Sequence, residues 1–136
     1  MAKKPYYQHW LEEADKDFRY ASWSLENAEE NFYSFILFHF QQAAEKYLKA
    51  YIVFKKLPFK KIHDLAELLA IIKIADQSFV KIENKAVFLN DFYVDTRYPV
   101  YWPTGHTKEL AVKAKQAVQG IGSFVKKKIG GAGIEI

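Results

Sequence analysis

The segment at residues 93–106, YVDTRYPVYWPTGH, holds the most distinctive candidate for chemistry in the chain. Arg97 is one of only two arginines, against eighteen lysines, and tyrosines lie near it at positions 93 and 98. A guanidinium group binds phosphate through two parallel hydrogen bonds and stacks on aromatic rings, which an ammonium group does less well. Arg97 is therefore a candidate anion contact, with Tyr93 and Tyr98 available to stack a base. The same residue equally suits a structural bond to a carboxylate or to carbonyls, and the sequence leaves both interpretations open.

Three histidines are further candidates for chemistry. His63 precedes Asp64, which either holds one imidazole nitrogen and leaves the other free for acid–base work or simply caps the following helix. His106 follows Arg97 closely enough in the chain to act beside it. His39 lies in the apolar run FILFHFQQ, which is typical of a core or interface histidine.

Several classes of site are missing from the sequence. There is no cysteine, which excludes disulfides and thiolate sites. The zinc-binding pattern HExxH, the phosphate loops GxGxxG and GxxxxGK[ST] and the nucleophile pattern GxSxG are also absent. We therefore predict neither a metal nor a cofactor.

Apolar residues recur at helical spacing along most of the chain, and no segment alternates as a strand does. The pattern predicts helices at 6–28, 32–56, 64–75, 83–96 and 108–128, with Thr107 as the N-cap of the last. The second helix is apolar on two sides, which favours a central position or a shared subunit interface. The fourth is expected to end near Arg97, whose charge would complement the helix dipole. The fold class predicted is all-α: an up-and-down bundle of four main helices plus a short extra helix.

Length and composition predict one helical domain over residues 1–129 and a flexible tail over 130–136. Residues 31–136 carry sixteen basic and nine acidic groups, a balance that suits an anionic ligand and equally a lysine-solvated surface. No apolar run approaches the roughly 18 residues of a membrane span, and no apolar segment follows the N-terminal lysines. We expect a cytoplasmic protein that does not contact a membrane.

Four pieces of the sequence occur in an order that resembles the HEPN domain, the higher eukaryotes and prokaryotes nucleotide-binding domain. They are WLEEADKDFRYASWSLEN, FHFQQAAEKYLKAYIV, HDLAELL and YVDTRYP, and the resemblance extends over residues 8–126. It implies a small stand-alone prokaryotic protein with an all-α fold that forms a homodimer. It also implies pairing with a minimal nucleotidyltransferase in a toxin–antitoxin-like two-component system.

Many HEPN domains are metal-independent ribonucleases in which a histidine follows an arginine after four to six residues, whereas others bind nucleotides without catalysis. This chain departs from the nuclease motif, because eight residues separate Arg97 from His106 and two of them are Pro99 and Pro103. Two prolines prevent both side chains from projecting regularly from one helix end.

The interpretation that we favour is a HEPN protein without catalytic activity that binds a nucleotide or an RNA phosphate. The residues expected to contact it are Arg97, Tyr93, Tyr98, His63 and Lys46, the last two because of their places in the HDL and AAEKYLKA pieces. One alternative is a metal-independent endoribonuclease in which Arg97 steadies the phosphate and His106 or His63 acts as acid or base. A second alternative is a purely structural dimer.

Overall fold

The computed structural model describes residues 4–27, 32–93 and 106–131, and every regular element in these ranges is a helix. The elements are α1 (Tyr6–Asn27), α2 (Tyr33–Phe54), α3 (Leu65–Ala75), the 3-10 helix η2 (Gln77–Ile82), α4 (Glu83–Asn90) and α5 (Lys108–Gly130). The all-α prediction is confirmed.

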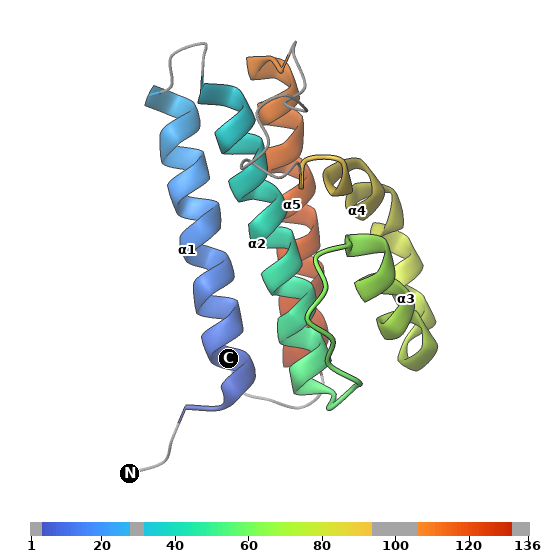
Figure 1. Cartoon of the computed structure of the whole chain (residues 1–136). Coiled ribbons are helices and arrows are strands. Elements are labelled where there is room, and N and C mark those ends of the chain that lie inside the picture. The colour runs from blue at the N-terminus through green and yellow to red at the C-terminus, as the bar shows by residue number, and fades with distance from the viewer. Residues whose placement is uncertain (1–3, 28–31, 94–105, 132–136) are drawn as a thin grey trace.

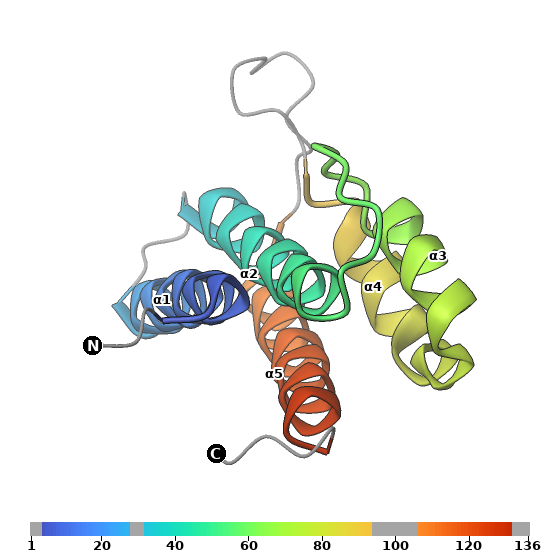
Figure 2. The same cartoon turned by 90° about the horizontal axis from the view of Figure 1, so that it is seen from below.

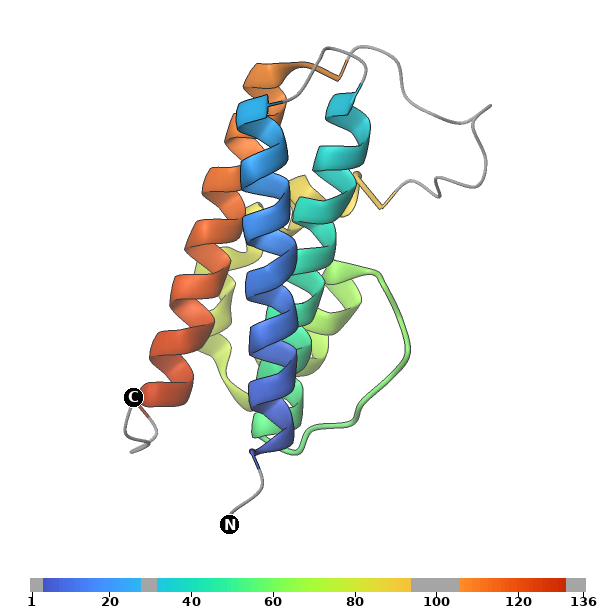
Figure 3. The same ribbon diagram turned by 90° about the vertical axis from the view of Figure 1, so that its left-hand side faces the viewer.

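Three long helices form the body of the molecule. α1, α2 and α5 run side by side along its whole length, and α3, η2 and α4 pack as a shorter second layer on one side (Figures 1 and 3). Seen along the long helices, α2 lies between α1 and the second layer, and α5 completes the bundle (Figure 2). Because α2 contacts α1, α3, α4 and α5, it is buried on several sides, as its dense apolar sequence predicts.

Local capping sets where two of these helices begin. The Asp64 carboxylate accepts hydrogen bonds from the backbone amides of Ala66 and Glu67 and so caps α3. The Thr107 hydroxyl accepts from the Leu110 amide at 3.1 Å and caps α5, as predicted. Both caps satisfy amides that the first helical turn leaves without partners.

The fourth helix ends earlier than predicted. α4 stops at Asn90 instead of continuing to residue 96, and a turn follows at Asp91 and Phe92. The physical reason is tertiary, because the Asn90 side chain accepts from the Leu65 amide at 2.8 Å and so ties the end of α4 to the start of α3. α4 therefore ends seven residues before Arg97, which lies outside the described residues.

A 3-10 helix that the sequence pattern did not predict joins α3 to α4. Its N-cap, Asp76, accepts hydrogen bonds from the amide and the hydroxyl of Ser78, at 3.0 and 2.6 Å, and lies 3.0 Å from the Lys128 ammonium. The hydroxyl of Ser78 and then Lys128, against the opposing effect of desolvation, lower the pKa of Asp76 to about 2. Asp76 thus connects the second layer to the end of α5.

Helix α5 is continuous through its two central glycines, although their low helix propensity predicts a weak middle. Gly122 is buried, and a Cβ at this position would lie 3.0 Å from the ring of Tyr47. The Tyr47 hydroxyl in turn donates to the Asp15 carboxylate on α1. The missing side chain therefore allows α2 and α5 to approach closely, which offsets the cost in propensity.

Candidate functional site

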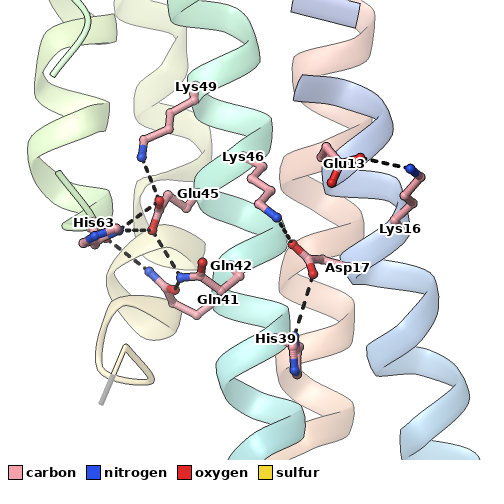
Figure 4. A network of polar contacts seen from close by, with 10 residues as sticks. All are labelled: Glu13, Lys16, Asp17, His39, Gln41, Gln42, Glu45, Lys46, Lys49 and His63. Carbon is pink, nitrogen blue, oxygen red and sulfur yellow. Dashed lines mark hydrogen bonds and ion pairs between the residues drawn. The ribbon is translucent and has the colours of Figure 1, made fainter. Parts of the chain in front are cut away.

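A buried carboxylate lies in the middle of α2. The Glu45 side chain is only 5% exposed, and burying an isolated carboxylate would cost far more than a folded domain can tolerate. Three donors surround it: Lys49 Nζ at 2.8 Å, His63 Nδ1 at 3.1 Å and Gln42 Nε2 at 3.3 Å (Figure 4). Glu45 therefore organises a polar cluster that includes one of the predicted site residues.

The same helix also holds the backbone of the connector that carries His63. Gln41, which is fully buried, donates from Nε2 to the His63 carbonyl oxygen at 3.2 Å. Its side-chain oxygen accepts from Gln42 Nε2 at 2.8 Å. Because α2 bonds both the backbone and the ring of His63, it fixes the position and the orientation of the imidazole (Figure 4).

The His63 ring is half exposed and stacked on an aromatic ring. Its centroid lies 4.6 Å from that of Tyr93, and the two planes differ by 14°. Nδ1 faces Glu45, so Nε2 is the ring nitrogen that this carboxylate does not engage. A histidine oriented in this way offers Nε2 as an acceptor when neutral and as a charged donor when protonated.

Lys49 supplies the charge that balances Glu45. Its side chain is 7% exposed, and its ammonium lies 5.7 Å from the ring centroid of Trp10 and 5.8 Å from that of Phe59. Aromatic faces attract a cation and replace part of the hydration that burial removes. Since Lys49 already neutralises Glu45, the cluster has no net negative charge that would repel an anion at its exposed end.

The structure settles the two interpretations of the His63–Asp64 pair. Asp64 caps α3 and accepts a hydrogen bond from Asn90 Nδ2 at 3.2 Å, so its carboxylate acts as a helix cap. The carboxylate that holds the imidazole is Glu45, eighteen residues earlier, which sequence reasoning missed. A sequence signal was present, because Gln41, Glu45 and Lys49 recur every four residues along a largely apolar helix and so share one face.

Lys46 is placed on a different side of α2 from His63. Its ammonium lies 2.6 Å from the Asp17 carboxylate on α1, and His39 Nδ1 lies 3.7 Å from the same carboxylate (Figure 4). Burial acts to raise the pKa of Asp17, but the contacts with His39 and Lys46 outweigh it and the pKa is lowered. Lys46 is thus held by the interface between α1 and α2.

His106 and His63 have different partners among the described residues. Its Nδ1 is 2.7 Å from the Ser34 hydroxyl, its ring meets the ring of Phe92 edge-on at 5.7 Å, and burial lowers its pKa. Ser34 and Glu45 are eleven residues apart on α2, about 16 Å along a helix axis. The two predicted acid–base histidines therefore contact α2 at positions about three turns apart, whereas their aromatic partners, Phe92 and Tyr93, are consecutive residues. Arg97 and Tyr98 lie outside the described residues.

Within the described ranges, no group of three or more histidines and carboxylates is arranged to bind a metal ion. Nor does any helix in those ranges combine the length and the apolar character that crossing a bilayer requires.

Comparison with known proteins identifies the family. The sequence model of the HEPN domain matches residues 7–128, nearly the whole chain. The chain belongs to the HEPN domain family. This HEPN chain superposes on the crystal structure of ST0689, an archaeal HEPN homologue, with a TM-score of 0.72, 25% identity and coverage of 95% of this chain and 99% of the other. It superposes equally well on the crystal structure of TT1696 from Thermus thermophilus, with a TM-score of 0.72, 27% identity and coverage of 92% and 99%.

No curated protein matches the sequence significantly. The HEPN match includes the Glu45 cluster, His63 and Tyr93, so the candidate site lies within the family domain. What this HEPN protein binds must therefore be inferred from the chemistry of the site itself.

Proposed function

We propose that this HEPN protein binds a nucleotide or an RNA phosphate at the exposed end of the Glu45 cluster. The observation that carries the proposal is the His63 imidazole, half exposed, stacked on Tyr93 and held at Nδ1 by a buried carboxylate. A ring fixed in this way presents Nε2 to a phosphate without loss of side-chain freedom on binding, which favours affinity. In the ribonuclease alternative, the same atom would serve as acid or base.

The connector between α2 and α3 supports an anionic ligand. Four lysines lie on it, all of them exposed: Lys55, Lys56, Lys60 and Lys61. Phe59, 42% exposed, lies among them. Cations interleaved with an aromatic ring are typical of surfaces that bind single-stranded nucleic acid or nucleotides.

Arg97 is proposed as the second phosphate contact. It follows Tyr93 by four residues, a separation that an extended chain spans in about 14 Å. A guanidinium that binds the phosphate bidentately would add the geometric specificity that the lysines lack. Tyr98 and Lys46 remain predictions from the sequence, and the pairing of Lys46 with Asp17 makes it the weaker of the two.

The test is a thermal-shift titration with ATP, GTP and a short single-stranded RNA. A ligand at about a hundred times its dissociation constant adds about 2.7 kcal/mol to the free energy of unfolding, a shift of several degrees. We expect His63→Phe, which keeps an aromatic ring but removes both nitrogens, and Arg97→Ala to reduce the shift. His9→Phe is the matched control, because His9 is exposed on α1, and it should behave as the wild type.

No shift in the wild type with any of these ligands would refute the proposal, as would equal shifts in all variants. Arg97→Lys separates the two interpretations of Arg97. If Arg97 contacts the phosphate, the variant should bind the ligand less tightly and keep the stability of the wild type. If Arg97 makes a structural bond within the protein, the variant should be less stable. RNA that is shortened during incubation with the wild type, and not with His63→Phe or His106→Ala, would support the endoribonuclease alternative.

We also propose that the protein is a homodimer and pairs with a minimal nucleotidyltransferase in a toxin–antitoxin-like system. The support is family membership, in which dimers and such partners are expected from the resemblance. Sedimentation of the purified protein tests the dimer. Co-purification with a nucleotidyltransferase encoded beside it tests the partner, and separate elution of the two proteins would contradict the pairing.

A further inference from the structure

Four large aromatic side chains form one exposed surface on α1 and the start of α2, here named the aromatic patch. Its members are Tyr20, Trp23, Phe32 and Phe35, which are 57%, 63%, 50% and 50% exposed. They border a groove of about 450 Å³ that is also lined by Ser24, Asn27, Ile36 and His39. Monomeric proteins rarely expose several neighbouring large aromatic side chains, and such patches mark interaction sites.

The patch lies on the side of the bundle away from the second layer. Among the described elements α1 packs on α2 and α5, whereas α3, η2 and α4 lie on the opposite side of α2 (Figure 2). The groove is lined by α1, α2 and the residue that precedes α2. No other described helix covers it.

We propose that the aromatic patch is the surface on which a second copy of this chain docks, with the same patch on both subunits. This inference rests on the homodimer of the proposed function and assigns its interface. In a two-fold dimer each surface meets its own copy, so a charge at the axis would meet a like charge. The described residues that line the groove include no lysine, arginine, aspartate or glutamate. Two copies of the patch can therefore meet without bringing like charges of these residues together.

The shape of the patch also allows the patches of two subunits to fit together. Exposed rings of Trp23 and Phe32 stand beside a groove, so one surface provides both the projecting groups and the space to receive them. Exposed aromatic side chains are enriched at the cores of protein interfaces. An RNA partner is less suitable, because the groove offers aromatic rings but no lysine or arginine among its described lining residues to contact the phosphates.

The four rings account for about half of the area that a stable dimer buries. A large aromatic side chain buries about 150–250 Å² when fully covered, so each half-exposed ring has about 100 Å² left to bury. The four rings then supply about 400 Å² per subunit. A stable interface buries about 800 Å² per partner, with about 600 Å² at the small end, so the rings provide about half and the other groove residues must add the rest.

The test is sedimentation velocity over a range of concentrations for the wild type, Trp23→Ala and Trp23→Lys. The wild type should be a dimer, and Trp23→Ala should raise the dimer dissociation constant by about 30-fold or more, as expected for a buried tryptophan. Trp23→Lys places two cations near the axis and should give a monomer. Because Trp23 is 63% exposed, both variants should keep the wild-type circular dichroism spectrum. Val80→Lys is the control, since Val80 is 54% exposed on η2, outside the patch.

The possible outcomes test the proposed interface and the existence of the homodimer separately. A dimeric wild type with dimeric Trp23 variants would refute the interface and leave the homodimer standing, whereas a monomeric wild type would refute both. If the Trp23 variants stay dimeric but lose RNA binding, the occupant of the groove is RNA and the inference is wrong. Ligand shifts at His63 are measured separately, so failure of nucleotide binding leaves this test unaffected.

Discussion

Removing the buried charge of Glu45 should destabilise the protein more than removing that of Lys49. Glu45→Leu leaves the Lys49 ammonium 7% exposed with only the rings of Trp10 and Phe59 beside it among the described residues. Breaking a buried ion pair from one side costs about 3–5 kcal/mol, and we expect a loss in that range. Lys49→Met leaves Glu45 with His63 still 3.1 Å away, and we expect a smaller loss of about 1–3 kcal/mol.

The double variant Glu45→Leu/Lys49→Met should be close to the wild type or more stable. Two apolar side chains of similar volume avoid the desolvation of both charges, and such replacements are often neutral or stabilising. The coupling between the two sites should therefore be large, whereas independent sites would be additive.

The assay is equilibrium unfolding in urea, with the slope compared between variants to confirm that the denatured states are alike. Glu83→Gln serves as the control. It breaks the Lys73–Glu83 pair, which is 2.7 Å long but has side chains 26% and 41% exposed, and it should cost less than about 1 kcal/mol. If Glu45→Leu costs no more than Glu83→Gln, or if the single losses simply add, Glu45 and Lys49 do not form a desolvated ion pair.

Two further predictions concern the helices that frame the site. Gly122→Ala should be less stable than Gly120→Ala by about 1–3 kcal/mol in urea unfolding: both gain helix propensity, but only the first presses a methyl group onto the ring of Tyr47. The second variant meets only the flexible end of Lys85, so equal stabilities would contradict the close approach of α2 and α5. For Asp76, the folded pKa of about 2 lies below the ordinary 3.8, so its contribution is complete above about pH 4 and is lost as the pH falls toward 2. Solvent screening limits the loss to about 1 kcal/mol, and Asp76→Asn should remove this part of the pH dependence.

Much of the fold could be predicted because the helices and their caps depend on residues that are close together in the sequence. Helical spacing of apolar residues identified all five α-helices of the described ranges, and their boundaries agree within a few residues except at the end of α4. Asp64 and Thr107 act on amides within three residues of themselves, so their capping roles are visible in the sequence. The end of α4 was predicted wrongly because Asn90 bonds to Leu65, a residue twenty-five positions away.

The candidate site shows the same division. His63 and Tyr93 were proposed from separate pieces of sequence, and the stacking of their rings depends on how the second layer packs against α2. Glu45 was missed because a glutamate on a helix is normally solvated, and only its position beneath the connector buries it. Lys46, one position further along, faces α1 instead, because successive residues of a helix point about 100° apart.

The order of residues along the chain was enough to specify the helices, two of their caps and, through four short pieces, membership of the HEPN family. These features depend on residues near one another in the chain or on a pattern shared with relatives. Packing between helices determined which carboxylate holds His63, where Lys46 is paired and that His106 meets Ser34. The periodicity of a helix shows which of its faces is apolar, but the partner that a side chain meets is set by which helix packs opposite, a contact between residues distant in the chain.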